Sequence, residues 1–285
     1  MSAGRGRIEC LGVRKTYRDL AEGNEIVALD GLSLEIQARE FLTLLGPSGC
    51  GKSTLLNMIA GFEKPDNGSL LLDGRPIERP GPDRGVVFQD YALFPWLDVQ
   101  HNVEYGLREK GLARPEAAAV ARHYLELVGL GGSETKYPHE LSGGMRQRVA
   151  LIRVLAIDPR ILLMDEPFAA VDAQTRTILQ AELEQLWVQT VKTVVFVTHS
   201  VDEAVYLSDR VAVMTARPGR VKEIVPIQLP RPRDPTAEAF NAYRRELTRL
   251  IEVEARKVFE SLLATGQGGG GASRRRRAED DDTAT

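Results

Sequence analysis

Long apolar runs are missing from this 285-residue chain, and so is any concentration of cysteines. No run of roughly 18 apolar residues occurs, so we expect that no segment of the chain spans a bilayer. The two cysteines, Cys10 and Cys50, form neither a CxxC pair nor a metal-ligand pattern, which favours a reducing cytosolic compartment. Residues 1–7 include two arginines but no apolar stretch follows them, which argues against a secretory signal.

An excess of charge of either sign is also missing. The chain has 37 lysines and arginines against 40 aspartates and glutamates, and its net charge of −3 gives no reason to expect nucleic-acid binding. A hydrophobic content of 43% with 27% charged residues is typical of a soluble globular protein. The length suffices for one large domain or two modest ones with a buried core.

Short apolar segments alternate with helical patterns along most of the chain. Residues 41–45 and 161–164 are near-continuous apolar runs, as expected of parallel strands buried on both faces. Residues 32–36 alternate apolar with polar side chains, which predicts a half-exposed antiparallel strand. We therefore predict an α/β fold with a mostly parallel sheet, an N-terminal antiparallel β subdomain, and an α-helical subdomain inserted at about residues 92–157.

The C-terminal part of the chain differs in composition from the rest. Residues 236–265 carry apolar side chains at helical spacing, which predicts an amphipathic helix after a main domain of residues 1–235. Residues 266–285 contain four consecutive glycines, four consecutive arginines and an acidic cluster, with almost nothing apolar to bury. We expect this last segment to be a disordered charged tail whose opposite charges nearly cancel.

The segment GPSGCGKST matches the phosphate-binding pattern G-x-x-x-x-G-K-[ST]. It comprises Gly46, Pro47, Ser48, Gly49, Cys50, Gly51, Lys52, Ser53 and Thr54. It follows a predicted buried strand and opens a helix, where consecutive backbone N–H groups converge on an anion. Lys52 supplies a mobile positive charge for the β- and γ-phosphates, and Ser53 offers its hydroxyl to Mg²⁺. The segment therefore predicts a nucleotide site in a P-loop NTPase core of the RecA-like kind.

Two acidic residues follow the apolar run at residues 161–164. A carboxylate at Asp165 is costly there unless it meets a cation, and Mg²⁺ shared with Ser53 would meet that need. Glu166 is expected to face away from Asp165, because neighbouring residues of a strand alternate, and it is our candidate to polarise the attacking water. The alternative is an Asp-Glu pair that only caps a turn before Pro167.

A second anion-binding helix start is predicted at Ser142, Gly143 and Gly144, which offer free N–H groups and a hydroxyl. On its own, Ser-Gly-Gly would more readily indicate a tight turn. Within the segment LSGGMRQR at residues 141–148, it resembles the signature of ABC transporters, and the chain resembles their ATP-binding subunit. The resemblance implies that the signature of one subunit closes on the nucleotide held by a second copy, so that a dimer sandwiches two ATP molecules with Mg²⁺.

The resemblance assigns four further positions. Tyr17 matches the aromatic residue that stacks on adenine, although packing at a strand end would also explain it. Gln89 matches the glutamine that senses the γ-phosphate and Mg²⁺ and leads into the contact with the membrane subunit. His199 matches the switch histidine that touches the γ-phosphate. Asp172 matches the aspartate that contacts the opposing subunit, and helix capping would equally explain it.

The resemblance therefore implies an ATP hydrolase coupled to transport. The expected catalytic residues are Lys52, Gln89, Glu166 and His199. The expected metal-binding residues are Ser53, Gln89 and Asp165. The other residues of the phosphate loop and the signature, with Tyr17 and Asp172, are expected to bind ATP.

A narrower resemblance concerns importers of nitrate, sulfonate and taurine. Residues 81–90, 93–97 and 99–103 look like the matching segments of those proteins, as do residues 165–168 and 172–176. Such importers pair two ATPase subunits with two integral membrane permeases and an external solute-binding protein. This implies a peripheral position on the cytoplasmic side of the cell membrane and uptake of a small oxyanion, whose identity the permease and binding protein select.

A cluster of apolar residues, Phe94-Pro95-Trp96, lies just past Gln89. The resemblance implies that a permease helix docks here. The alternative is an ordinary apolar turn packed on the helical insert.

Some positions depart from the ABC pattern. Residues 169–172, Ala-Ala-Val-Asp, replace Gly-Ala-Leu-Asp, and Ser200 stands where aspartate is common. Ile152 and Val154 add bulk beside the signature helix, where the family often has alanine. Cys50 lies at a helix start, which favours the thiolate, so we expect thiol reagents to inactivate the protein unless nucleotide protects it.

Two other classes of protein share the phosphate loop. ABC ATPases of the DNA-repair or translation type have no permease, but they usually carry two modules in tandem or a long coiled-coil insert, whereas this chain has one module. GTPases and small-molecule kinases lack Leu-Ser-Gly-Gly, and this sequence lacks the Asn-Lys-x-Asp guanine reader. The non-transport ABC ATPase is therefore the alternative to the importer.

Overall fold

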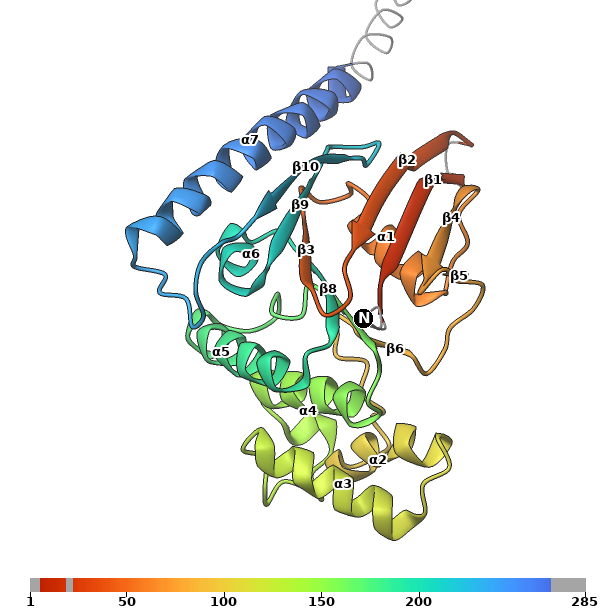
Figure 1. Cartoon of the computed structure of the whole chain (residues 1–285), viewed down its shortest axis with the longest axis vertical. Coiled ribbons are helices and arrows are strands. Elements are labelled where there is room, and N and C mark those ends of the chain that lie inside the picture. Colours follow the sequence, from red (N-terminus) through yellow and green to blue (C-terminus); the bar gives the residue numbers. More distant parts are fainter. Residues whose placement is uncertain (1–5, 19–22, 268–285) are drawn as a thin grey trace, which may run out of the picture.

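The computed structural model describes residues 6–18 and 23–267, with side-chain burial described as far as residue 260. Two sheets lie at the centre of the molecule, and a group of helices extends from one end of it (Figure 1). The predicted disordered tail, residues 266–285, lies outside the described residues from 268 onward.

The first sheet is antiparallel and comes from the N-terminal part of the chain. Its order is β2-β1-β4-β5, with β1 Ile8–Arg18, β2 Glu25–Ile36, β4 Asn67–Leu72 and β5 Arg75–Pro76. Leu32, Leu34 and Ile36 are buried and the residues between them are exposed, as the alternation predicted. Gly68 has a φ of 83°, and a Cβ there would lie 2.4 Å from the carbonyl oxygen of Gly12, so glycine is required where β4 meets β1.

The second sheet is mostly parallel. Its order is β10-β9-β3-β8-β7-β6, with β3 Phe41–Leu45, β6 Arg84–Val87, β7 Ile161–Asp165, β8 Thr193–Thr198, β9 Arg210–Met214 and β10 Val221–Pro226. Among these described strands, β10 alone runs antiparallel to its neighbour. Every residue of β3 and β8 is buried, because both faces of the sheet are covered. The predicted α/β fold, with a mostly parallel sheet and an N-terminal antiparallel one, is confirmed.

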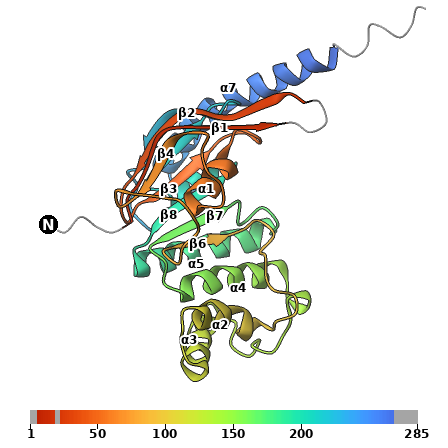
Figure 2. The same ribbon diagram turned by 90° about the vertical axis from the view of Figure 1, so that its right-hand side faces the viewer.

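Helices cover both faces of the parallel sheet and also form a separate group. They are α1 Lys52–Ala60, α2 Val99–Glu109, α3 Arg114–Leu127, the 3₁₀ turn η1 Pro138–Glu140, α4 Gly143–Ala156, α5 Ala173–Thr190, α6 Val201–Leu207 and α7 Glu238–Gln267. Helices α2, α3 and α4 follow β6 in the chain and lie at the end of the molecule remote from the antiparallel sheet (Figures 1 and 2). In the part of the chain that the structure describes, no helix combines the length and apolar character needed to cross a membrane.

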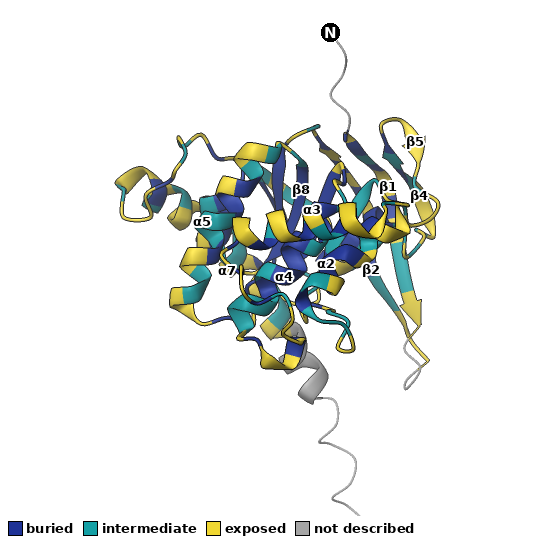
Figure 3. Ribbon diagram, turned by 90° about the horizontal axis from the view of Figure 1, so that it is seen from below, coloured by how far each residue is buried: buried dark blue, intermediate teal, exposed yellow. Residues whose placement is uncertain are grey.

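Successive residues of the parallel strands point into two separate cores. On β8, Val194 and Phe196 join a core that includes side chains of α4 and α5. Val195 and Val197 instead join a core with α1 and the antiparallel sheet. Figure 3 shows these strands buried between helices whose outer faces are exposed. Because strand residues alternate between faces, α1 and α4 pack against opposite faces of the parallel sheet.

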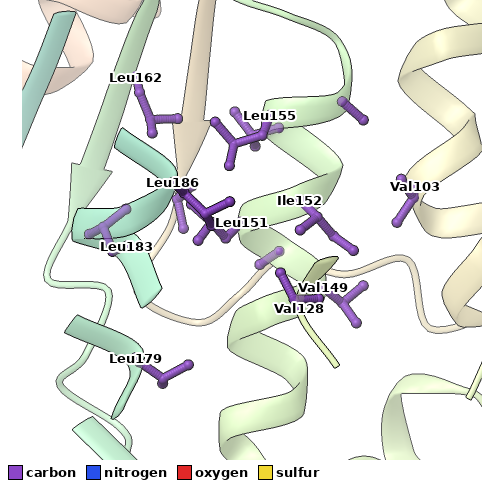
Figure 4. Close-up of a cluster of buried hydrophobic side chains, with 14 of the residues drawn as sticks. Val103, Val128, Val149, Leu151, Ile152, Leu155, Leu162, Leu179, Leu183 and Leu186 are labelled. Carbon is purple, nitrogen blue, oxygen red and sulfur yellow. The ribbon is translucent and has the colours of Figure 1, made fainter. Parts of the chain in front are cut away.

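Helix α4 lies at the centre of the helical group. Its apolar side chains meet those of α2 on one side and α5 on the other (Figure 4). Ile152 is fully buried and Val154 is nearly so. Val154 packs directly on Gly85 of β6, where an added Cβ would lie 2.1 Å from the Val154 methyl carbon. The glycine thus makes room for the bulk that Val154 adds beside the signature helix.

The C-terminal helix α7 packs beside β9 and β10. Phe240 and Leu247 are buried there with apolar residues of α6 and β9. Further along the helix, the Glu254 side chain is only 1% exposed and accepts a hydrogen bond from the backbone N–H of Ala216. Burial opposes ionisation of this carboxylate, but hydrogen bonds from Lys222 and Lys257 lower its pKa to about 2. Residue 254 therefore fixes α7 to the turn that follows β9.

Candidate nucleotide-binding and catalytic site

The phosphate loop connects β3 to α1 as the sequence predicted. Gly49 and Gly51 have φ values of 75° and 94°, in the left-handed region that favours glycine. A Cβ on Gly51 would lie 2.9 Å from the Ala28 carbonyl oxygen, so the loop also has no space for a side chain there. Helix α1 starts at Gly51 without a side-chain cap. The N–H groups of its first turn are therefore available to an anion.

The ammonium group of Lys52 lies inside this loop. Its Nζ donates to the carbonyl oxygens of Gly46, at 2.8 Å, and Pro47, at 3.0 Å. The residue is only 5% exposed, and among the described residues no carboxylate forms an ion pair with it. Among the described residues, its hydrogen-bond partners are these carbonyl oxygens and the Cys50 sulfur, at 3.8 Å, and a buried cation held in this way is well suited to meet phosphate oxygens.

The other end of the loop lies close to β1. The Tyr17 hydroxyl donates to Glu63, at 2.5 Å, and lies 3.3 Å from the hydroxyl oxygen of Thr54. Burial, with the Glu63 hydrogen bond, raises the pKa of Tyr17, so the phenol stays neutral. Tyr17 remains 37% exposed, which leaves part of its ring open to a nucleobase.

Ser48 and Gly49 form the tip of the phosphate loop. Arg217 donates from Nε to the Gly49 carbonyl oxygen at 3.2 Å.

The expectation of a thiolate at Cys50 was wrong. The residue is 1% exposed and its side chain belongs to the apolar core beneath α1, where its sulfur lies 3.8 Å from Lys52 Nζ. Burial raises the pKa of the Cys50 thiol, and the nearby Lys52 only partly offsets this effect. Backbone N–H groups at the helix start also lower the Cys50 pKa, but burial outweighs them. Only the backbone of Cys50 remains available to line the phosphate site.

Ser53 and Asp165 meet at the carboxyl end of the parallel strands. The Ser53 hydroxyl donates to Asp165 Oδ1 at 3.1 Å, across a large separation in sequence. Burial raises the pKa of Asp165, the Ser53 hydrogen bond opposes this, and the charge of Glu166 adds to it. A hydroxyl beside a carboxylate whose charge is poorly solvated is a donor set that fits Mg²⁺, which prefers oxygen ligands. These two residues would hold the ion next to the phosphate loop.

Glu166 and His199 form the adjacent pair. His199 Nδ1 lies 3.0 Å from Glu166 Oε2, within hydrogen-bonding distance. The Glu166 backbone leaves the strand with a φ of 44°, a left-handed conformation that costs a non-glycine residue about 1–3 kcal/mol. Its N–H donates to the Val197 carbonyl oxygen at 2.9 Å, which anchors this strained position on β8. The left-handed turn, rather than simple strand alternation, sets the direction of the Glu166 side chain.

A buried acidic network next to His199 was not predicted from the sequence. Glu203, on α6, is 4% exposed and accepts a hydrogen bond from Thr198 at 2.5 Å, while Arg176 lies 3.9 Å away. Burial raises the pKa of Glu203. Ser200 caps α6 by accepting from the Glu203 N–H, so its hydroxyl does the capping expected of the more common aspartate. The sequence gave no signal of this network, because the partners of Glu203 lie on β8 and α5, outside its own helix.

The signature residues and Asp172 occupy two neighbouring helix starts. Ser142 caps α4, its hydroxyl accepting from the Met145 N–H at 3.3 Å. Asp172 caps α5 by accepting hydrogen bonds from the N–H groups of residues 174 and 175, and the bond at 175 contributes most to lowering the Asp172 pKa. A Cβ on Gly144 would lie 2.6 Å from the Thr175 methyl group, so glycine is required where α4 approaches α5.

The chain does not bring its own signature onto its own phosphate loop. Within the described ranges, no hydrogen bond or ion pair joins residues 142–144 to residues 46–54, and α4 packs on the opposite sheet face from α1. Gln89 lies exposed in the turn after β6. The structure brings five of the predicted site residues together: Lys52, Ser53, Asp165, Glu166 and His199. The signature residues and Asp172 lie apart from this group.

Several known proteins resemble this chain in sequence. The profile of the family described as "ABC transporter" matches residues 29–169. An uncharacterized ABC transporter ATP-binding protein, MJ0412 of Methanocaldococcus jannaschii, is 57% identical over 235 residues, which cover 82% of this chain and 88% of that protein. The aliphatic sulfonates import ATP-binding protein SsuB of Bacillus cereus is 42% identical over 80% of this chain and 89% of its own length.

Two further relatives extend the comparison. The bicarbonate transport ATP-binding protein CmpC of Synechococcus elongatus is 51% identical over 75% of this chain, but the match covers only 33% of that longer protein. Among solved structures, the dimeric ATP-binding cassette MJ0796 bound to ADP and Pi is similar, with a TM-score of 0.70 and 33% identity. That match covers 78% of this chain and 99% of the cassette.

Proposed function

Because this chain belongs to the family of ABC transporter ATP-binding subunits, which hydrolyse ATP, we propose that it powers the import of a small anion through separate permease subunits. The observation that carries the catalytic part is the gathering of Lys52, Ser53, Asp165, Glu166 and His199 at one edge of the parallel sheet. The proposal that this ATPase serves an importer rests on the similarity of the chain to SsuB and CmpC.

The site residues divide the work of hydrolysis. The N–H groups of the loop and Lys52 would bind the β- and γ-phosphates, while Ser53 and Asp165 would hold Mg²⁺. Mg²⁺, when bound, supplies positive charge that offsets the charge of the phosphate oxygens. Tyr17 would cover the adenine.

Glu166 and His199 act on the attacking water. Glu166 would accept a hydrogen bond from this water as its oxygen bonds to the γ-phosphorus and the bond to the ADP oxygen breaks, giving ADP and phosphate. His199, at 3.0 Å from Glu166, would hold that carboxylate in place and contact the γ-phosphate. Gln89, exposed at the end of β6, would approach the same phosphate and its metal when the loop that carries it moves.

The second wall of each site would come from a second copy. The helix start at Ser142, Gly143 and Gly144 offers N–H groups to an anion but stands apart from its own phosphate loop. Two copies arranged head to tail would place each signature on the ATP of the other, with Asp172 at the same interface. The similarity to the dimeric MJ0796 cassette supports this arrangement.

A groove on the helical group, lined by both apolar and charged side chains, is our proposed contact for a permease. Its cavity of about 570 Å³ is lined by Trp96, Tyr105 and Arg108, among others. Phe94 packs on Tyr105, with ring centroids 4.7 Å apart, so this part of the cluster is an ordinary packed turn. Trp96 is different, since it is 70% exposed. An exposed tryptophan beside a groove suits the insertion of an apolar helix from a membrane protein, and such a contact would put this subunit on the cytoplasmic membrane face.

Two of the relatives are named for anionic solutes. SsuB is named for aliphatic sulfonates and CmpC for bicarbonate, so we propose a small oxyanion as the solute of this importer too. The subunit would not contact this solute, which an external binding protein would deliver to the permease. The likeness to these two ATPases supports a small oxyanion as the class of solute. The permease and the binding protein would select the particular anion.

Co-purification from native membranes tests this proposal. The tagged protein is expected to bring down an integral membrane permease, and Trp96→Ala is expected to lose that partner while keeping its ATPase activity in solution. Exposed Val188→Ala on α5 serves as a control and should retain the partner. Purification without any membrane protein, with the activity intact, would favour the non-transport ABC ATPase instead.

A further inference from the structure

The loop just past Gln89 is strained and buried at one residue, Tyr91. Tyr91 and Ala92 have φ values of 63° and 46°, so two successive non-glycine residues are left-handed. Such conformations are unfavourable for non-glycine residues and persist only where the surroundings hold them. Because Tyr91 is only 8% exposed, this is not a free surface turn.

A side chain of the signature helix, Arg153, holds the backbone of that loop. Arg153, on α4, donates from Nη1 to the Ala92 carbonyl oxygen at 2.6 Å and from Nη2 to the Tyr91 carbonyl oxygen at 3.1 Å. Its guanidinium also lies 5.4 Å from the centroid of the Phe94 ring. The fork of Arg153 therefore ties the loop that carries Gln89 to the helix that Ser142 begins.

The Tyr91 side chain reaches the start of the same helix. Its ring lies 5.7 Å from the guanidinium carbon of Arg146, and its hydroxyl lies 3.6 Å from the position that a Cβ on Gly143 would take. The Ala170 carbonyl oxygen lies 3.7 Å from that same position. Thus the Tyr91 hydroxyl, the signature glycine and the turn that leads to Asp172 meet at one point.

The Tyr91 hydroxyl is buried without a partner. It makes no hydrogen bond with any described residue, although its oxygen is inaccessible. A buried hydroxyl without a partner is unfavourable, so a small movement that gives it an acceptor is favourable. The nearby Ala170 carbonyl is such an acceptor.

We propose that Tyr91 is a positioning residue that links Gln89 to the signature. When Gln89 engages the γ-phosphate of its own site, the loop moves and the Tyr91 hydroxyl donates to the Ala170 carbonyl oxygen. This bond fixes the start of α4 and the turn before Asp172 in the arrangement that receives the ATP of the second copy. The inference rests on the proposed dimer, and it makes closure of one site depend on occupancy of the other.

Tyr91→Phe in a Glu166→Gln background tests this inference, because it removes only the hydroxyl. The ATP-dependent dimer is expected to have a dissociation constant raised by about fivefold for each hydroxyl lost, or about 25-fold for two. ATP affinity measured on dilute monomer should stay within about twofold. Without nucleotide, the thermal midpoint should be equal or higher, since an unpaired buried group is removed.

The matched control is Tyr124→Phe, which removes a hydroxyl from α3 of the same helical group. It should leave the dimer constant unchanged. An unchanged dimer constant in Tyr91→Phe, an equal change in Tyr124→Phe, or a lowered thermal midpoint in Tyr91→Phe would each overturn the role proposed here. If Glu166→Gln alone stays monomeric with saturating ATP, the proposed dimer fails first and the inference fails with it.

Discussion

Replacing Glu254 by glutamine tests how firmly α7 is fixed beside the phosphate loop. The carboxylate is 1% exposed and accepts from Ala216, next to Arg217, which in turn donates to the loop carbonyl of Gly49. Glutamine keeps the shape and the acceptor for Ala216 but loses the negative charge between Lys222 and Lys257. The variant therefore isolates the charge from the packing.

The pKa of Glu254 gives the magnitude. A fall from 4.5 to about 2 corresponds to an upper limit of about 3 kcal/mol. Lys257 is 57% exposed, so solvent screening reduces this, and we expect Glu254→Gln to lower the free energy of unfolding at pH 7 by about 2 kcal/mol. Because the folded pKa is below the unfolded one, this stabilisation is fully present above about pH 4.5 and is lost as the pH falls toward 2.

Urea unfolding followed by circular dichroism at several pH values measures this difference. The gap between the wild type and Glu254→Gln should be constant from pH 6 to 8 and narrow below about pH 4.5. Glu246→Gln, on an exposed face of the same helix, is the control and should change the free energy of unfolding by less than about 0.5 kcal/mol. Equal stability of Glu254→Gln and the wild type at pH 7, or a gap that acid does not narrow, would refute the reasoning.

Three further predictions concern the phosphate loop. Lys52→Ala should lower kcat for ATP hydrolysis at least about 100-fold, and a fall below tenfold in a steady-state assay would show that another cation serves the phosphates. Gly51→Ala should weaken ATP binding and lower stability by more than Gly74→Ala, because both positions have a positive φ but only the first meets a carbonyl oxygen; equal losses would contradict this. Thiol reagents should modify Cys50 slowly in the native protein and rapidly in urea, as followed by mass spectrometry, and rapid native labelling would contradict its burial.

Sequence reasoning succeeded where the chemistry is carried by contiguous residues. The phosphate loop needs glycines, a lysine and a hydroxyl in one short segment, so its pattern predicted both the local structure and the meeting of Ser53 with Asp165. The apolar runs at residues 41–45 and 161–164 likewise identified strands that are buried on both faces. In these places the local sequence and the tertiary environment favour the same structure.

Sequence reasoning failed where the environment of a residue depends on the direction of its side chain or on contacts with residues distant in sequence. The pattern placed Cys50 at a helix start but did not show that its sulfur faces the core. Glu203 and Arg176 come from different helices, and their approach depends on how α5 and α6 pack on the sheet. The unpaired Tyr91 hydroxyl also needed the structure, because its neighbours Gly143 and Ala170 are far from it in sequence.

The assembly state of Glu166→Gln with ATP tests whether two copies of the chain form an ATP-dependent dimer. One chain holds both the phosphate-binding and the water-activating groups. In the proposed dimer, the signature that completes each site comes from a second copy. Light scattering at saturating ATP and Mg²⁺ should show twice the mass of the 31.5 kDa chain, and this dimer should dissociate on exchange into ADP. A Glu166→Gln protein that binds ATP yet remains monomeric at micromolar concentration would contradict the account.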